Sequence, residues 1–220
     1  MTKYFKYFVY LYVLIGFSWS NAGSYEDFFS AIHFDHPEVI EKLLARGFDP
    51  NTPNEKGAPG LVAALQSEAP KSALLLAKHP KTNVELANSS GETPLMLAAI
   101  QNQLELARLL IDRGAEVNRK GWTPLHYAAT RGHREMMRLL LDHDAYIDSE
   151  SPNGTTPLMM AAYSGSPLSV KLLLEEGADP TLVNDGNVSA LDLAVSAERE
   201  QSALYIRAFI NAWHIQNPTE

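Results

Sequence analysis

Hydrophobic and polar positions follow a block that returns along most of the chain. The block opens on a Thr-Pro pair and runs through apolar residues to paired alanines, most clearly at Thr93–Ala99, Thr123–Ala129 and Thr156–Ala162. Looser copies begin at Ala58 and Ser189, so the starts fall at positions 58, 93, 123, 156 and 189. A block that returns at a near-constant period of about 33 residues indicates a repeat array.

Each block also holds a second apolar segment with helical spacing. In the third copy this segment runs from Gln103 to Ile111 and covers more than one helix face before Gly114 ends it. Helices this short are marginal alone in water, so neighbouring repeats must bury their apolar faces. We therefore predict an all-α fold of about six helix-turn-helix repeats, starting near residues 26, 58, 93, 123, 156 and 189.

The terminal copies differ from the internal ones in ways that suit caps. Tyr25, Phe28 and Phe29 are bulkier than the residues of internal copies, and the last segment, about 201–214, is half apolar and half polar. We place the repeat domain at residues 23–214 and a frayed tail at residues 215–220.

Two irregularities mark the fourth copy. Asp144 replaces the glycine that ends the second helix elsewhere, and aspartate tolerates the left-handed conformation that such a stop needs. The connection from Gly114 to Thr123 is three residues shorter than the one from Gly177 to Ser189. The missing residues come from the projecting turn, which leaves residues 119–122 at its tip.

Residues 1–22 have the pattern of a secretory signal peptide. Lys3 and Lys6 precede an uninterrupted apolar run from Tyr7 to Phe17, and small residues at Ser20 and Ala22 suit cleavage after Ala22. The run falls short of the roughly 20 residues that a membrane-spanning helix needs. We expect a periplasmic or secreted protein with no stable membrane insertion after cleavage; an uncleaved anchor is the alternative.

Charge and cysteine content exclude several classes of function. The formal net charge is −8 and no basic patch stands out, which argues against nucleic-acid binding. The absence of cysteine rules out disulfides, thiolate metal sites and a cysteine nucleophile. An exported protein of this size without cysteine favours a bacterial periplasm.

With these residues the chain resembles the ankyrin-repeat family. The resemblance rests on T-P-L-H-Y-A-A at 123–129, Gly132-His133, Leu139–Leu141 and on similar blocks at 109–118 and 172–180, and it covers about residues 24–214. It implies a curved solenoid with hairpin-like loops that binds proteins through loop tips and the concave face of the first helices. It also implies that His126 and His133 are structural histidines that tie loops together.

Motifs of catalysis and cofactor binding are missing from the sequence. The chain has no H-E-x-x-H, no G-x-S-x-G and no phosphate-binding loop. We therefore expect no enzyme activity, no cofactor and no metal site. A histidine-dependent hydrolase on the concave face is the remaining enzymatic alternative.

The candidate binding residues are those that vary between copies while the repeat frame stays fixed. They lie just before each Thr-Pro pair and just after each alanine pair. Trp122 is the most distinctive, and the sequence leaves open whether it is exposed for binding or folds onto the neighbouring hairpin. Arg119, Lys120 and Arg131 suggest a positive cluster. The full set is Ser90, Glu92, Gln101, Arg119, Lys120, Trp122, Thr130, Arg131, Asn153, Thr155 and Tyr163.

These observations predict a monomeric, non-catalytic protein that binds another protein. Small exported bacterial ankyrin proteins are similar to two functional types: immunity-like proteins that neutralise an effector, and accessory proteins of stress defence. Both stay open, as does a membrane-anchored scaffold held by an uncleaved N-terminal segment.

Overall fold

The computed structural model describes residues 23–164 and 166–216, and the proposed signal peptide lies outside them. The chain divides into two compact units, Met1–Gly91 (unit 1) and Glu92–Glu220 (unit 2). In unit 1, residues 23–33 are helical and are followed by three helices: α2 (Pro37–Ala45), α3 (Gly60–Gln66) and α4 (Pro70–Lys78).

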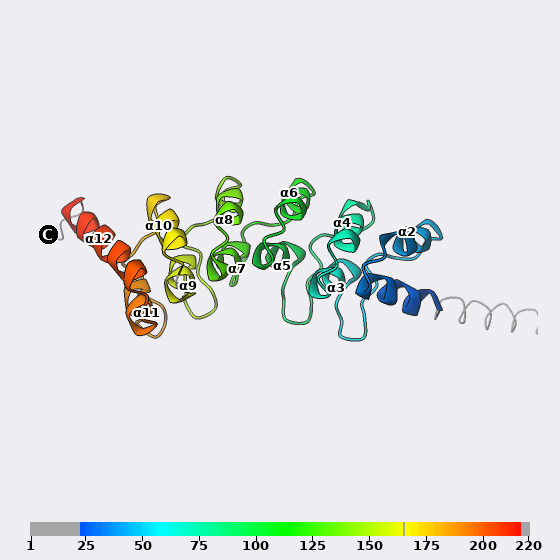
Figure 1. Ribbon diagram of the computed structural model, residues 1–220, viewed down its shortest axis with the longest axis horizontal. Coiled ribbons are helices and arrows are strands. Elements are labelled where there is room, and N and C mark those ends of the chain that lie inside the picture. The colour runs from blue at the N-terminus through cyan, green and yellow to red at the C-terminus, as the bar shows by residue number, and fades with distance from the viewer. Residues whose placement is uncertain (1–22, 165, 217–220) are drawn as a thin grey trace, which may run out of the picture. The chain divides into compact units, whose positions relative to one another are not determined.

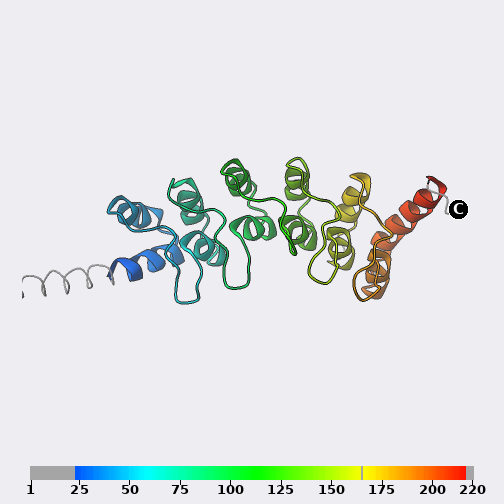
Figure 2. The same ribbon diagram turned by 180° about the vertical axis from the view of Figure 1, so that it is seen from behind.

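Unit 2 contains four helix pairs in chain order (Figure 1). The first helices of the pairs pack side by side, α5 on α7, α7 on α9 and α9 on α11, and each also packs on the second helix of its own repeat. Figure 2 shows the first and second helices of these pairs from behind. The pairs are α5 (Pro94–Ile100) with α6 (Leu104–Asp112), α7 (Pro124–Arg131) with α8 (Arg134–Leu141), α9 (Pro157–Ser164) with α10 (Pro167–Glu175), and α11 (Ala190–Ser196) with α12 (Glu200–Gln216).

The Thr-Pro pair starts the first helices as the sequence predicts. Thr93 is the N-cap of α5, its hydroxyl accepts from the N–H of Met96 at 3.3 Å, and Pro94 fills the first turn. The Met96 thioether in turn accepts from the N–H of Thr93 at 3.5 Å. His126 and Asp192 hold the equivalent position in later repeats, so this reciprocal bond is made by different side chains.

Left-handed residues make the turns between paired helices. Asn102 and Glu198 have positive φ angles of 56° and 58° at this turn, as does Gly132 at 72°. Asp144 has a φ of 61° after α8, which confirms that aspartate replaces the glycine of the helix stop. Because Asn, Asp and Gly accept this conformation at low cost, the chain reverses within a few residues.

The core consists of leucines and alanines at equivalent positions of successive repeats. Leu125, Ala128 and Ala129 of α7 are buried, and so are their counterparts in α5 and α9. Small alanines let neighbouring first helices approach closely, which is how short helices gain a continuous core. The all-α repeat fold predicted from the sequence is thereby confirmed; outside isolated bridges, the described residues form no β-structure.

Side-chain amides join neighbouring hairpins within each unit. The Asn51 amide donates to the Lys81 carbonyl at 2.8 Å, and its oxygen accepts from the N–H of Asn83 at 2.7 Å. In unit 2, Asn118 makes the same two bonds, at 2.7 and 2.8 Å, to the backbone of residues 144 and 146. A single asparagine therefore satisfies one donor and one acceptor of the next repeat.

The helices at the two ends of the described residues agree closely with the repeat domain expected at 23–214. Residues 23–33 are helical, starting at the first residue of that domain. At the other end α12 extends to Gln216, two residues past it. A helix runs on where no turn residue stops it, and no glycine or proline lies between Glu200 and Gln216.

Candidate protein-binding site

His126 is buried at the centre of unit 2 and links two repeats. Its Nδ1 accepts from the N–H of Thr123 at 3.2 Å, so Nε2 carries the proton and donates to the Thr155 carbonyl at 2.9 Å. Burial lowers the pKa of His126, against the opposing effect of hydrogen bonds to the Thr155 and Ser149 backbone. The neutral ring thus joins two successive loops by hydrogen bonds, as the family resemblance implies.

His133 performs a similar task between helices. Its Nε2 lies 3.1 Å from the carbonyl oxygen of Ile100, at the C-terminal end of α5. Within the described residues, no group of three or more His, Asp or Glu side chains is arranged to hold a metal ion.

Trp122 is both packed and accessible. Its ring meets the His126 ring edge to face, with centroids 5.3 Å apart and an interplanar angle of 76°, yet 38% of its surface remains exposed. Trp122 is therefore partly exposed and partly packed on the helix that follows it, and its role in binding stays a prediction. An aromatic side chain that is already held on one side loses little conformational freedom on binding.

The short loop before α7 rests on the next hairpin. Gly121 has a φ of 87°, and a Cβ there would lie 3.5 Å from Cγ of Pro152. Lys120 is exposed and Arg119 is half-buried beside it in the chain. The loop is thereby supported by the following repeat, which positions Trp122.

Arg131 lies at a distance from this loop along α7. It is the last residue of α7, whereas the loop precedes the first. At 1.5 Å per residue, the eight steps from Thr123 to Arg131 span about 12 Å. The backbones of Lys120 and Arg131 therefore lie at opposite ends of α7, and the positive cluster stays a prediction.

A row of accessible side chains lies between these ends, on the first helices of unit 2. Its members stand four and seven residues after each N-cap residue, so they share one face of their helix. Tyr163 is the most exposed of its large apolar and aromatic members, with 59% of its surface accessible. We call this set the first-helix row: Ile100, Tyr127, Thr130, Met160, Tyr163, Leu193 and Ser196, all of them half-buried or exposed.

Tyr127 links the first-helix row to a residue just before a Thr-Pro pair by a hydrogen bond. Its hydroxyl donates to the Glu92 carboxylate at 3.3 Å. Burial and the nearby negative charge of Glu92 raise the pKa of Tyr127 to about 12. Glu92 precedes α5 and Tyr127 lies on α7; Trp122 and Met160 hold the equivalent sequence positions one repeat later.

The sequence missed Tyr127, Met160 and Leu193. They belong to the repeat frame in the sequence, and only their half-buried state reveals that the stacked helices leave them accessible. The available signal was helical spacing, because Met160 lies one turn before Tyr163.

The remaining predicted residues fall into different environments. Ser90 is exposed in unit 1, Gln101 and Thr130 are half-buried in unit 2, and Asn153 is exposed on a hairpin. Thr155 contradicts the prediction, because it is only 7% exposed and its carbonyl is occupied by His126. It therefore supports the hairpin from inside rather than offering a contact.

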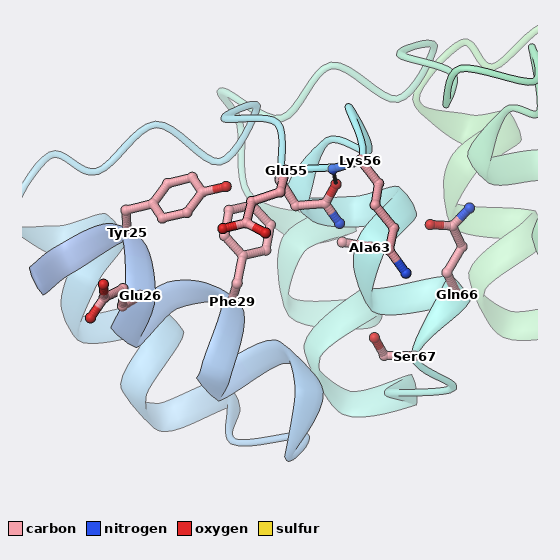
Figure 3. A pocket seen from close by; sticks show the side chains of 9 residues that line it. Tyr25, Glu26, Phe29, Glu55, Lys56, Ala63, Gln66 and Ser67 are labelled. Carbon is pink, nitrogen blue, oxygen red and sulfur yellow. Dashed lines mark hydrogen bonds between the residues drawn. The ribbon is translucent and has the colours of Figure 1, made fainter. Parts of the chain in front are cut away.

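Unit 1 has a hollow of its own, of about 470 Å³. Tyr25 and Phe29 of the first helix form one side, and their rings meet edge on with centroids 4.9 Å apart (Figure 3). Glu55 and Lys56 of the following hairpin border it with opposite charges.

Comparison with known proteins agrees with this geometry. The family profile for ankyrin repeats (3 copies) matches residues 28–120, 116–184 and 145–211. The chain belongs to the ankyrin-repeat family. Solved ankyrin repeat domains have the same fold: one from Acinetobacter baumannii AYE has a TM-score of 0.72 at 24% identity and covers 84% of this chain and 97% of its own. The human ASB11 domain has a TM-score of 0.74 at 25% identity, with coverage of 83% and 82%.

Curated ankyrin-repeat relatives are much longer. Rat ankyrin repeat and SAM domain-containing protein 6 is 32% identical over 163 residues, which are 74% of this chain but 15% of the relative. The chicken nuclear factor NF-kappa-B p105 subunit is 34% identical over 154 residues, 67% of this chain and 16% of the relative. Ankyrin repeats are protein-interaction modules and in general non-catalytic scaffolds. No helix among the described residues has the length and apolar character needed to cross a membrane.

Proposed function

We propose that this ankyrin-repeat chain binds a partner protein through the first-helix row together with Trp122. The observation that carries the proposal is the accessible aromatic and apolar row on neighbouring first helices, with Tyr163 59% exposed and Trp122 38% exposed. Lys120 lies at one end of α7 and Arg131 at the other, and both are exposed.

The chemistry of the row suggests the chemistry of the partner. Tyrosine, tryptophan and arginine supply much of the binding energy in protein interfaces because they bury large areas with few rotatable bonds. An apolar segment of the partner would cover Met160 and Tyr163, and acidic side chains beside it would meet Lys120 and Arg131. A partner with an apolar patch bordered by carboxylates fits this surface best.

We further propose that the protein acts in the periplasm or after secretion. Support comes from the N-terminal lysines, the apolar run from Tyr7 to Phe17 and the small residues before Gly23. Mass spectrometry of the mature protein tests this: a chain starting at Gly23 supports export, and an intact Met1 supports the membrane-anchored scaffold instead.

A matched pair of tyrosines tests the binding surface. Tyr163→Ala should weaken capture of the native partner at least tenfold, because it removes an exposed anchor of the row. Tyr146 is 69% exposed but lies outside the row, so Tyr146→Ala should leave capture unchanged. Equal losses from both variants, or none from Tyr163→Ala, would reject the row as the site.

The role of the complex separates two further possibilities. An immunity-like protein should form a stoichiometric complex that abolishes the activity of the captured effector. A stress-defence accessory should instead leave a deletion strain sensitive to oxidant when no effector is present. Turnover of a substrate by the purified protein would favour the hydrolase alternative over both.

A further inference from the structure

The described part of the last repeat of unit 2 exposes two large apolar side chains beside the charged residues Glu198, Arg199, Glu200 and Arg207. Val195 of α11 is 50% exposed and Leu204 of α12 is 57% exposed. Both line a hollow of about 490 Å³ between the two helices. On its other side α12 packs against α10 and α11, so this face lies at the end of the repeat stack.

Val195 shows that this face has the character of a repeat interior. In the preceding repeats the equivalent residues Ala99, Ala129 and Ala162 are fully buried. A capping repeat needs a polar outer face for solubility. Here the alanine is replaced by the larger and equally apolar valine, which favours coverage of this end over exposure to solvent.

The charges on α12 indicate what covers it. Glu200, Ala203, Leu204 and Arg207 all line the hollow and are spaced i, i+3, i+4 and i+7, so they form one face of the helix. Glu200 lies at one end of this face and Arg207 at the other, and the midpoint falls between Ala203 and Leu204. An antiparallel copy of the same helix would set Glu200 against Arg207 twice, and Leu204 against Ala203 twice.

We propose that two copies of this chain form a dimer through these faces, with their α12 helices antiparallel about a twofold axis between Ala203 and Leu204. Such an interface is self-complementary, as twofold symmetry requires. Ala203 is only 5% exposed and lies at the bottom of the hollow, so Leu204 of the partner copy would enter the hollow above it, at an interhelical distance of about 8–10 Å. Parallel pairing would put like charges together and is disfavoured.

α12 has 17 residues, so it is long enough for both ends of the proposed contact to lie on the same helix. At 1.5 Å per residue the helix is about 26 Å long, whereas the other second helices have 8 or 9 residues. The proposed dimer differs from the monomer expected from the sequence. It does not depend on the proposed partner, whose surface lies on the first helices.

Charge reversal on the purified full chain tests the interface. Sedimentation equilibrium over a concentration series should show dimers, and Glu200→Arg or Arg207→Glu alone should weaken them roughly tenfold or more. The double variant with both changes should recover dimerisation, because each reversed charge again faces its opposite. Glu176→Arg reverses an exposed charge outside the face and should change nothing.

A distance measurement tests the orientation. The chain has no cysteine, so Asn211→Cys offers a single, exposed labelling position on α12. Antiparallel helices centred between Ala203 and Leu204 place the two labels roughly 25 Å apart, and parallel helices place them about 10 Å apart. A monomer at every concentration, a dimer insensitive to charge reversal, a double variant without recovery, or the short distance would each overturn the proposal. A monomeric chain that loses capture of a different protein when Leu204 is changed would likewise overturn it, and would assign the face to that protein instead.

Discussion

The Nε2 of His126 donates a hydrogen bond to the Thr155 carbonyl, 29 residues away, while its Nδ1 accepts from the N–H of Thr123. This arrangement requires the neutral ring, since a proton on Nδ1 would face the Thr123 N–H donor. Burial lowers the pKa of His126 below its usual 6.5. The unfolded chain therefore binds a proton more readily than the folded one.

Unit 2 should consequently lose stability in acid through this residue. The contribution of His126 is complete above pH 6.5, the unfolded value, and declines as the pH falls from there toward the lowered folded pKa. His126→Met places at this position the side chain that Met96 and Met159 supply in neighbouring repeats. At pH 8 the variant should lose about 1–2 kcal/mol of unfolding free energy, because methionine cannot donate the hydrogen bond to the Thr155 carbonyl.

Urea unfolding of wild type and His126→Met between pH 8 and pH 5 measures the effect. The gap between the two proteins should narrow toward pH 5, because only the wild type must keep a buried imidazole neutral. A gap that stays constant would mean that His126 does not titrate against folding.

The Thr155 bond also separates the features that the sequence predicts from those that depend on contacts between repeats. The repeat frame, the Thr93-Pro94 helix start and the left-handed Asp144 were predictable because each depends on residues close in the chain. Burial of Thr155 depends on a histidine one repeat earlier. The accessibility of Tyr127 and Met160 depends on how stacked helices cover each other, which spacing in the chain does not specify.

Asp148 is a position where a substitution should stabilise the fold. Asn51 and Asn118 each donate to one backbone carbonyl and accept from one N–H of the next hairpin. Asp148 accepts from the N–H of Asp179 at 3.2 Å but, when ionised, has no proton to donate. Burial raises the pKa of Asp148, helped by the charge of Asp179 and opposed by that hydrogen bond.

Asp148→Asn should restore the missing donor and raise stability at pH 7.5 by about 1 kcal/mol. The raised pKa means that the folded wild type takes up a proton more readily than the unfolded chain, so the wild type gains stability as the pH falls. The advantage of the variant should thus shrink toward pH 4 in thermal unfolding. Asn118→Asp is the reverse control, and a gain from that change would contradict the argument.

Gly132 combines two constraints, a left-handed backbone and a close neighbour at its Cβ position. Its φ is 72°, and a Cβ would lie 2.7 Å from the Ser166 hydroxyl oxygen. Gly114 also has a positive φ, of 85°, but nothing lies within 4 Å of its Cβ position. Gly114→Ala should cost about 1–2 kcal/mol from conformation alone.

Gly132→Ala should cost more, about 3 kcal/mol, because α7 and α10 must also move apart. Urea unfolding of the two variants side by side measures the difference. Equal costs would show that the contact with Ser166 relaxes freely, and that only the backbone conformation selects glycine.

Trp122 offers a way to separate packing from binding at one residue. Trp122→Ala removes both the edge-on contact with His126 and the exposed part of the indole, so it should lose about 1–2 kcal/mol of stability along with partner capture. Trp122→Tyr keeps an aromatic edge against His126 and should retain most of the stability. Because tyrosine presents a smaller surface, capture should still fall severalfold.

Arg131→Ala removes an exposed charge and should reduce capture without any change in the unfolding midpoint. One result would contradict a direct role of Trp122 in binding: Trp122→Tyr binds as tightly as wild type, while Trp122→Ala unfolds earlier and binds weakly. Trp122 would then act only by holding its loop on His126. The binding energy would lie with Tyr163 and the rest of the first-helix row.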